Sequence, residues 1–256
     1  MIASLPMYDL PDCRLANDRY WLLIRDALRS AGLMAPDALT RDMPDFMAHW
    51  QRPDLVLSQT CGYPFRAVLQ GKVTLIGTPD FGLEGCPPGY YQSLFVVRMR
   101  DTCSDVVAFK DARFAYNDAM SQSGWAAAQT HAAGLGFAFK PALQTGGHAL
   151  SARAVLDGVA DIAAIDAMTW RLLQRNDAGM AGLRVVGRTE PTPCLPYIAA
   201  LGAKHRKVFD AVAGAIAALD AGDRALLGIK RLLYIPAPAY LAVPTPAPPK
   251  AIAGPA

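Results

Sequence analysis

The sequence has few charged residues and no long apolar run, and each of these features excludes a class of protein. Only 18% of its 256 residues are Asp, Glu, Lys or Arg, whereas 52% belong to the set AVILMFWYC. This composition is typical of a compact folded protein and argues against disorder. No stretch approaches the ~20 apolar residues that a membrane-spanning helix needs. We therefore expect a chain that does not span a membrane.

Basic clusters and metal-binding spacings are also missing. The formal charge is only +3, and no run of Lys and Arg alternates with aromatics, so we expect no nucleic-acid partner. A small anionic ligand remains compatible with that balance. The five cysteines form no CxxC pair and no Cys/His ligand spacing, so we predict no metal and no cofactor. They favour thiols in a reducing compartment, and a bridge between Cys61 and Cys86 stays open as an alternative.

Known catalytic motifs and an export signal are absent as well. The chain has no GxSxG, no Walker loop and no HExxH. Cys61 or Cys86 could pair with His148 as nucleophile and base, but neither lies in a known signature, so we predict no catalytic residues. The opening "MIASLPMYD" has no basic or long apolar leader segment. As written, the sequence predicts a cytoplasmic protein, and a periplasmic one if a leader has been removed.

The chain alternates between short apolar strands and amphipathic helices. Expected strands are 2–6, 54–59, 73–78, 91–99, 114–117, 161–166 and 183–189. Expected helices begin after Asn17 as cap, after Gly124, near His148 and near Arg206. Such alternation predicts parallel sheets with helices on their faces. Residues 244–256, "PTPAPPKAIAGPA", have no periodicity and predict a disordered tail rich in proline and alanine.

Hydroxyl and glycine residues follow several of these strands, where ligands gather in such sheets. Ser121, Ser123 and Gly124 come just before a helix. One serine could be an ordinary N-cap. Alternatively, the first-turn amides, the helix dipole and both hydroxyls could hold phosphate-like oxygens, with Gly124 allowing close approach. The turn alone leaves both explanations open.

Two further turns have the same character. Thr145 and His148 flank a Gly-Gly pair at the start of another helix, and Thr60 follows a buried strand just before Cys61 and Gly62. Each could be a plain helix-start turn. Several such turns in one chain favour the anion-binding explanation.

Six stretches, in this order, carry a resemblance to a known family. They are "PDLVLSQTCGYPF", "LIGTPDF", "GCPPGYYQSLFVVR", "ARFAYNDAMSQSGW", "TGGHALSARAVLDGVADIAAIDAMTW" and "RTEPTPCLPYIA". Together they resemble the phosphate/phosphite/phosphonate family of ABC-transporter substrate-binding proteins, over nearly the whole chain to about Tyr240. The Ser-x-Ser-Gly turn with its upstream Asn is the most specific part.

This resemblance implies an α/β, two-lobed fold of the type II periplasmic-binding-protein kind, with two lobes joined by two crossover strands. Lobe one would comprise 1–93 and 190–243, and lobe two 94–189, with crossings near 90–96 and 188–193. By the same resemblance, the ligand-binding residues would be Tyr8, Thr60, Tyr90, Tyr91, Ser121, Ser123, Gly124, Thr145, His148 and Asp166. Asp166 would meet the amine of an aminophosphonate.

The resulting first hypothesis is a solute-binding protein for a small oxyanion, a phosphonate or related phosphorylated compound, without catalysis. It would be a monomer with an ABC permease as partner, and its lobes would close on the ligand. The alternatives are a cytosolic enzyme on the same fold, with His148 and Asp166 as candidate bases, and an intracellular ligand sensor.

Overall fold

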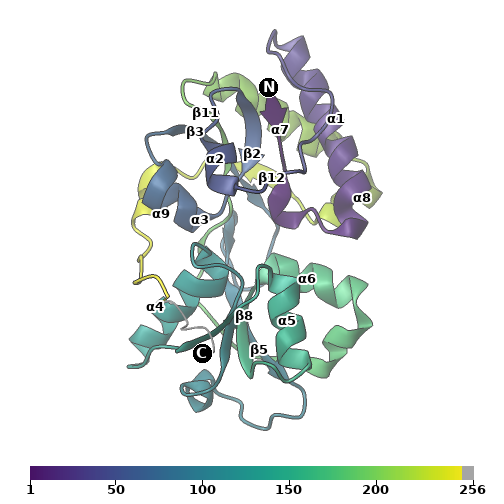
Figure 1. The fold of residues 1–256 in the computed structure, drawn as a ribbon. Coiled ribbons are helices and arrows are strands. Elements are labelled where there is room, and N and C mark those ends of the chain that lie inside the picture. Colours follow the sequence, from purple (N-terminus) through teal and green to yellow (C-terminus); the bar gives the residue numbers. More distant parts are fainter. Residues whose placement is uncertain (250–256) are drawn as a thin grey trace. The chain divides into compact units, whose positions relative to one another are not determined.

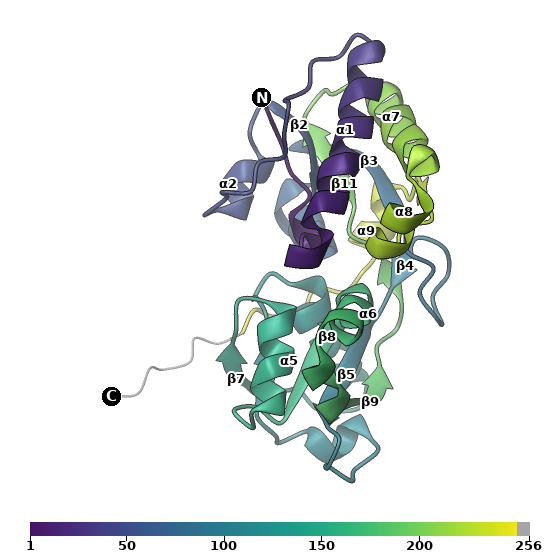
Figure 2. The same ribbon diagram turned by 90° about the vertical axis from the view of Figure 1, so that its right-hand side faces the viewer.

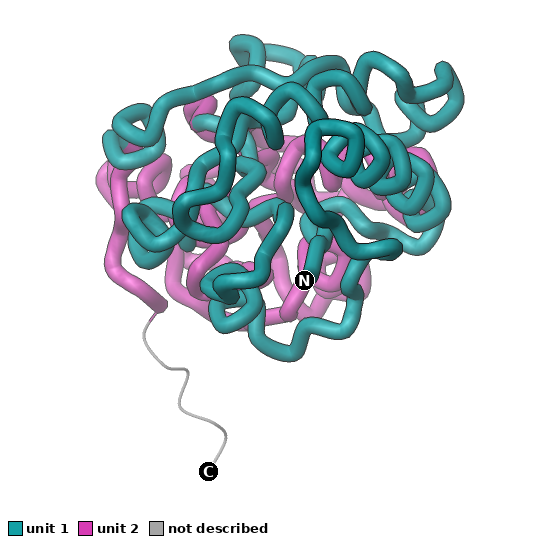
Figure 3. The backbone as a smooth tube through the Cα atoms, turned by 90° about the horizontal axis from the view of Figure 1, so that it is seen from above, with its two compact units in different colours: residues 1–90, 193–242 teal, residues 91–192, 243–256 magenta. Residues whose placement is uncertain are grey.

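The computed structural model describes residues 1–249 and divides into two compact units. Unit 1 comprises Met1–Tyr90 and Pro193–Ala242, and unit 2 comprises Tyr91–Thr192 and the described residues that follow Ala242, 243–249 (Figure 3). The chain thus passes between the units three times. Two passages fall in a two-stranded sheet of β4 (Tyr90–Tyr91) and β10 (Thr192–Pro193). The third passage follows Ala242.

Unit 1 is built on a five-stranded sheet with the order β1-β2-β11-β3-β12. Its strands are β1 (Ile2–Ala3), β2 (Leu55–Gln59), β3 (Val73–Asp80), β11 (Tyr197–Ala200) and β12 (Arg231–Leu233). β1 and β2 are parallel, whereas β11 is antiparallel to β2 and β3, and β12 is antiparallel to β3. The expectation of a parallel sheet is therefore wrong for the strands that return after Pro193. These strands run opposite to the three from the first segment.

Helices flank this sheet. Three of them, α1 (Arg14–Ser30), α7 (His205–Ala218) and α8 (Ala221–Leu227), pack together, as Figure 2 shows. The shorter helices are α2 (Phe46–Trp50), α3 (Gly62–Pro64) with its π-helical continuation η3 (Phe65–Leu69), and α9 (Ala237–Leu241). The predicted cap Asn17 is wrong, because the 3₁₀ turn Pro11–Cys13 leads directly into α1 at Arg14. Asn17 lies in the first turn instead and donates from Nδ2 to Asp9 at 2.9 Å.

Unit 2 has a second five-stranded sheet, with the order β7-β6-β8-β5-β9. Its strands are β5 (Ser93–Arg98), β6 (Phe114–Tyr116), β7 (Pro141–Gln144), β8 (Ile162–Asp166) and β9 (Leu183–Arg188). Here β6 is parallel to both β7 and β8, and only β5 runs against its neighbours. Every residue of β8 is buried, as expected of a central strand covered on both faces.

The helices of unit 2 begin where strands of this sheet end. They are η5, a π-helical turn (Gln122–Ala126), then α4 (Ala127–Gly134), α5 (His148–Leu156) and α6 (Ala167–Asn176). In Figure 1, α4 lies on one side of β8, and α5 and α6 lie on the other. Because β6, β7 and β8 are parallel, their carboxyl ends share one edge of the sheet. The turns after these three strands therefore lie together at that edge.

Candidate anion-binding site

Ser121 caps the helical segment that follows β6. Its backbone is extended, and its Oγ accepts a hydrogen bond from the Gly124 amide at 3.0 Å. Its carbonyl accepts from Ala126 at 3.0 Å, which opens the segment as a π turn. The capping explanation is thus correct for Ser121. Its hydroxyl proton takes no part in that bond and can still be donated to an anion.

Ser123 has a different partner, which sequence separation conceals. Its Oγ lies 2.8 Å from Nε2 of His148, the first residue of α5. The two turns that follow β6 and β7 thus meet through these side chains. Ser123 is buried, with 3% of its surface exposed. One predicted hydroxyl therefore caps a helix, and the other is oriented by an imidazole.

His148 is a neutral partner at physiological pH. Its Nδ1 is shielded from solvent, and burial lowers the pKa of His148 to about 4, although the Ala164 carbonyl acts in the opposite direction. A neutral imidazole donates from one nitrogen and accepts at the other. When its proton is on Nε2, His148 donates to Ser123, and the Ser123 hydroxyl can then donate to a bound oxyanion. When its proton is on Nδ1, the Ser123 proton is used by His148.

Gly124 cannot be replaced by a residue with a side chain unless Asn117 moves. A Cβ on Gly124 would stand 1.8 Å from Asn117 Oδ1 and 3.3 Å from its backbone nitrogen. That Oδ1 is buried and accepts no hydrogen bond from any other described residue. The Asn117 carbonyl accepts from the Gly146 amide at 2.8 Å, which ties the second turn to the first. Asn117 was absent from the predicted site residues, although the sequence places it just upstream of the turn.

Thr145 makes local bonds that shape the second turn. Its hydroxyl lies 2.7 Å from the Ser151 hydroxyl, and it donates to the Gly147 carbonyl at 3.0 Å. Its amide donates to the Tyr116 carbonyl at 2.9 Å, beside the Asn117–Gly146 bond. Thr145 is thus held close to the first turn. These contacts fit a residue that builds the start of α5.

Asp166 ends β8 and is almost fully buried, with 1% of its surface exposed. Its Oδ1 accepts from the Thr169 amide at 2.8 Å and so caps α6. Ser93 lies opposite Asp166 in the antiparallel pair of β5 and β8. The Ser93 hydroxyl also donates to the Ser123 carbonyl at 2.8 Å. Ser93 therefore links the strand position that carries Asp166 to the Ser123 turn, a link that the sequence does not reveal.

The other predicted contacts lie mainly in unit 1. Tyr8 is 8% exposed, and its ring meets Phe81 edge-on at 5.1 Å. It lines a cavity of about 20 Å³, room for one water molecule. Thr60 is fully buried at the end of β2, and its amide donates to Pro196 at 3.0 Å. Tyr90 and Tyr91 form β4, where the chain passes into unit 2.

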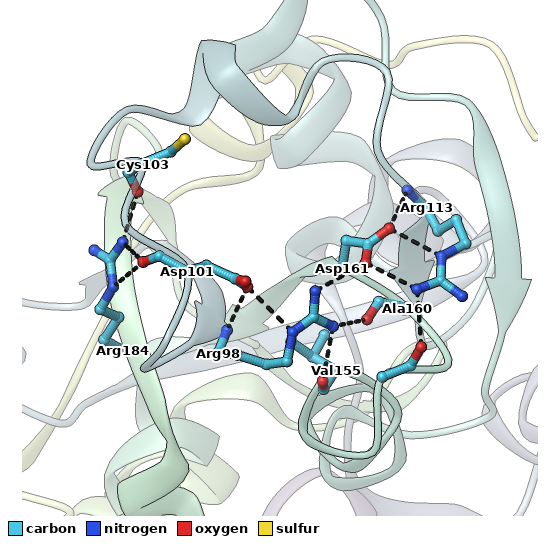
Figure 4. Close-up of polar contacts among 9 residues, drawn as sticks. Arg98, Asp101, Cys103, Arg113, Val155, Ala160, Asp161 and Arg184 are labelled. Atoms are coloured by element: carbon cyan, nitrogen blue, oxygen red, sulfur yellow. Dashed lines mark hydrogen bonds and ion pairs between the residues drawn. The ribbon is translucent and has the colours of Figure 1, made fainter.

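A separate arginine cluster in unit 2 is paired with carboxylates and carbonyls of the protein itself (Figure 4). Arg98 pairs with Asp101 at 3.2 Å and with Asp161 at 2.9 Å, and Arg113 also pairs with Asp161 at 2.9 Å. Arg184 donates to the carbonyls of Asp101 and Cys103. These bonds join β5 and β9 to the loop after β5 and to Asp161, the residue just before β8. Because each guanidinium already has oxygen partners, the cluster is a structural network rather than a site for an anion.

Cysteine and metal chemistry add no further site within residues 1–249. None of the five cysteines is in a disulfide, so Cys61 and Cys86 are not bridged here. No group of three or more His, Cys, Asp and Glu side chains in the described residues could hold a metal ion. Among the helices of this same part of the chain, none has the length and apolarity to cross a bilayer.

A family model matches most of the chain. The model described as "ABC transporter, phosphonate, periplasmic substrate-binding protein" matches residues 50–233. This span exceeds half of the chain and contains every predicted site residue except Tyr8. No curated protein sequence matches the chain significantly.

Solved structures resemble the chain over nearly its full length. PhnD1 from Prochlorococcus marinus, solved with methylphosphonate, has a TM-score of 0.71 and 17% identity, and the match covers 93% of this chain and 94% of that one. XAC2383 from Xanthomonas citri, bound to ATP, has a TM-score of 0.69 and 13% identity, covering 95% and 97%. The phosphonate-transporter binding protein PA3383 from Pseudomonas aeruginosa has a TM-score of 0.65 and 16% identity, covering 91% and 80%. At these identities the likeness shows the fold, which is that of type II periplasmic binding proteins.

Proposed function

The chain belongs to the family of periplasmic substrate-binding proteins of phosphonate ABC transporters, and from this premise we propose that it binds a small phosphonate or related phosphorylated oxyanion. The observation that carries the proposal is the pair of turns joined by Ser123 and His148 at 2.8 Å. Ser121, the first amides of η5 and, when the His148 proton is on Nε2, Ser123 supply neutral donors at a helix start, where anions are favoured. The binding role follows from the family, and the chemical class of the ligand is our inference.

The hydrogen-bond donors of this site are neutral, so they can bind an anion without neutralising its charge. His148, with a pKa lowered to about 4, adds no positive charge near pH 7. Binding then rests on hydrogen bonds to oxygens, each worth roughly 1.5–3 kcal/mol when the acceptor is charged. The ligands named for two structural neighbours, methylphosphonate and ATP, share tetrahedral phosphorus with ionised oxygens. This shared group supports phosphorus oxyanions as the ligand class for this chain.

Asp166 would distinguish among such ligands. We propose that its carboxylate contacts the amine of the ligand, so that an aminophosphonate is preferred over a plain alkylphosphonate. The carboxylate of Asp166 would attract the ammonium group of an aminophosphonate, and a plain alkylphosphonate carries no cation for it to attract. One oxygen of Asp166 caps α6 through Thr169, so the side chain is held at the end of β8.

Closure of the two units on the ligand is the mechanism we propose. Tyr8, Thr60 and Tyr90 of unit 1 would meet a ligand already held by the hydroxyls of unit 2. Such a ligand stabilises the closed state by its extra contacts there. The partner that recognises the closed state would be the permease of an ABC transporter. The description of the family as periplasmic supports that compartment over a cytoplasmic one.

A hydrolytic enzyme is the second candidate, because one observation favours it specifically. A serine hydroxyl 2.8 Å from an imidazole nitrogen has the geometry of a nucleophile and its base. Two features make Ser123 and His148 a poor catalytic pair. A base with a pKa of about 4 removes protons poorly near pH 7. Moreover, His148 Nδ1 has no carboxylate partner among the described residues to orient the ring.

A thermal-shift panel tests the proposed ligand class. The panel contains phosphate, phosphite, methylphosphonate, 2-aminoethylphosphonate and, as a matched control of similar shape and lower charge, methanesulfonate. A true ligand at one hundred times its Kd adds about 2.7 kcal/mol, which raises the Tm by about 5–10 °C. We expect at least one phosphorus compound to do so and methanesulfonate to have little effect. No shift with any phosphorus compound, or a larger one with methanesulfonate, contradicts the assignment.

A further inference from the structure

The chain leaves unit 1 for the last time from a firmly anchored helix, α9. Tyr240 in this helix is 1% exposed, and its ring lies 5.2 Å from that of Phe65. Its hydroxyl lies 2.6 Å from the Thr78 hydroxyl and donates to the Cys194 carbonyl at 2.8 Å. The same ring lies beside Gly62, two residues after Thr60. One end of the final passage is therefore fixed next to a predicted ligand contact.

The other end of this passage is held by Trp125. The Ala247 carbonyl accepts a hydrogen bond from Trp125 Nε1 at 3.0 Å. Trp125 is 3% exposed, and its ring lies 5.0 Å from that of Tyr116. It directly follows Gly124 in η5. The second anchor is thus part of the turn that carries Ser121 and Ser123.

Residues 243–249, which we call the C-terminal strap, are short and stiff. Their sequence, "VPTPAPP", contains four prolines, and each proline fixes φ and favours an extended chain. From Tyr240 to Ala247 the chain advances seven residues, which span at most about 23–25 Å when fully extended. The covalent chain sets this limit on the Tyr240–Ala247 distance in every state. While Trp125 is bonded to the Ala247 carbonyl, the chain therefore also limits the distance between Tyr240 and Trp125.

We propose that the C-terminal strap is a third tether between the units, which limits how far they separate when no ligand is bound. This inference rests on the closure mechanism proposed above. The two β4–β10 passages act as the hinge, and the strap bounds the motion about it. Because the strap is fixed at Trp125, it also holds the Ser121–Gly124 turn in place. When the open state is restricted, less conformational entropy is lost on closure. Binding is therefore stronger without any added ligand contact.

Trp125→Phe is the variant that separates this role from a packing role. It removes the indole N–H and keeps an aromatic ring against Tyr116. Ala247 is exposed, so its released carbonyl can bond to water at little cost. Trp21→Phe is the matched control, because Trp21 in α1 is 1% exposed and also donates from its indole to a carbonyl, that of Pro36, at 3.2 Å. A chain ending at Ala242 removes the strap entirely.

The measurement is the distance distribution between spin labels on the two units of the ligand-free protein. Labels at Leu15 in unit 1 and Leu150 in unit 2 stand at exposed positions, 70% and 58%. They are attached by chemistry that does not use cysteine, because the native thiols would otherwise react. We expect Trp125→Phe and the shortened chain to broaden the distribution and extend it to longer distances. Trp21→Phe should leave the distribution unchanged.

Two outcomes would overturn the tether. One is an unchanged distribution in both the Trp125→Phe protein and the shortened chain. The other is equal broadening in Trp21→Phe, which would show a general loss of packing. Because the measurement needs no ligand, it gives a result even if the proposed ligand class is wrong. Affinity for methylphosphonate is the second readout. We expect Trp125→Phe to weaken it about threefold, because a smaller fraction of the ligand-free protein would be in the binding-competent state.

Discussion

Replacing Gly124 with alanine should disable the proposed anion site through a steric clash with one side chain. The new Cβ would stand 1.8 Å from Asn117 Oδ1 and 2.9 Å from its Cγ. No real contact is that short, so either the Asn117 amide or the start of η5 must move. The Asn117 backbone nitrogen, 3.3 Å away, leaves little room for the backbone to adjust. Overpacking of this kind typically costs about 1–3 kcal/mol of folding stability.

The effect on binding follows from the same displacement. If η5 shifts, at least one hydrogen bond to the charged ligand is lost, at a cost of roughly 1.5–3 kcal/mol. We therefore expect Gly124→Ala to bind methylphosphonate about tenfold to one hundredfold more weakly by calorimetry. Urea unfolding of the same sample gives the stability change.

A second substitution identifies Asn117 as the cause. Asn117→Ala removes a buried oxygen that has no partner in the described residues, so it should cost little stability by itself. In the double variant the clash with the amide is gone, and part of the lost stability and affinity should return. We expect a coupling energy of about 1–2 kcal/mol between the two sites. Additive losses, or a Gly124→Ala protein that behaves like the parent, would refute the reasoning.

Three further predictions concern residues of the proposed site. Ser123→Ala should weaken methylphosphonate binding by roughly 1.5–3 kcal/mol, measured by calorimetry. Ser121→Ala should instead lower folding stability by about 1 kcal/mol through the lost cap, measured by urea unfolding. Unchanged affinity in Ser123→Ala would show that Ser123 does not contact the ligand. Asp166→Asn should keep the α6 cap but lose the preference for 2-aminoethylphosphonate over methylphosphonate, and an unchanged ratio of their Kd values would exclude an amine contact. The pKa of His148 is about 4 in the folded protein, below its value of 6.5 in the unfolded chain, so its stability contribution is present above pH 6.5 and declines by up to about 3 kcal/mol between pH 6.5 and 4. His148→Gln should show a shallower loss over that range, and parallel stability curves would contradict the shift.

Local structure was largely predictable from the sequence because it depends on neighbouring residues. The apolar run at 114–116 followed by hydroxyls and glycine predicts a strand, a turn and a helix start, and the structure has β6 and then η5. The individual role of each serine was not predictable. Ser121 bonds three residues ahead, whereas the partner of Ser123 is His148, which lies 25 residues away on another helix. Only the folded sheet brings the two turns together.

Strand direction and the contact of the C-terminal strap with Trp125 could not be predicted from the sequence for a similar reason. The alternation of strands and helices predicts parallel pairing, but β11 and β12 belong to a returning segment and run opposite to β2 and β3. Direction within a sheet depends on which distant segment pairs, and an apolar run such as 197–200 does not encode that. The proline-rich composition from Pro244 onward predicts a disordered tail over 244–256, of which residues 250–256 lie outside the described part of the chain. The Trp125–Ala247 bond is a long-range contact that composition cannot indicate.

The most direct test of the account is a ³¹P NMR titration of the protein into one sample that contains phosphate, methylphosphonate and 2-aminoethylphosphonate. The three compounds have separate resonances, so a single spectrum reports which one binds and whether any is converted. We predict that at least one resonance, foremost that of 2-aminoethylphosphonate, broadens or shifts in proportion to protein and returns unchanged when the protein is removed. Three sharp resonances unaffected by excess protein would contradict binding of this ligand class. A new product resonance that is lost in Ser123→Ala would contradict the binding-protein assignment in favour of the enzyme.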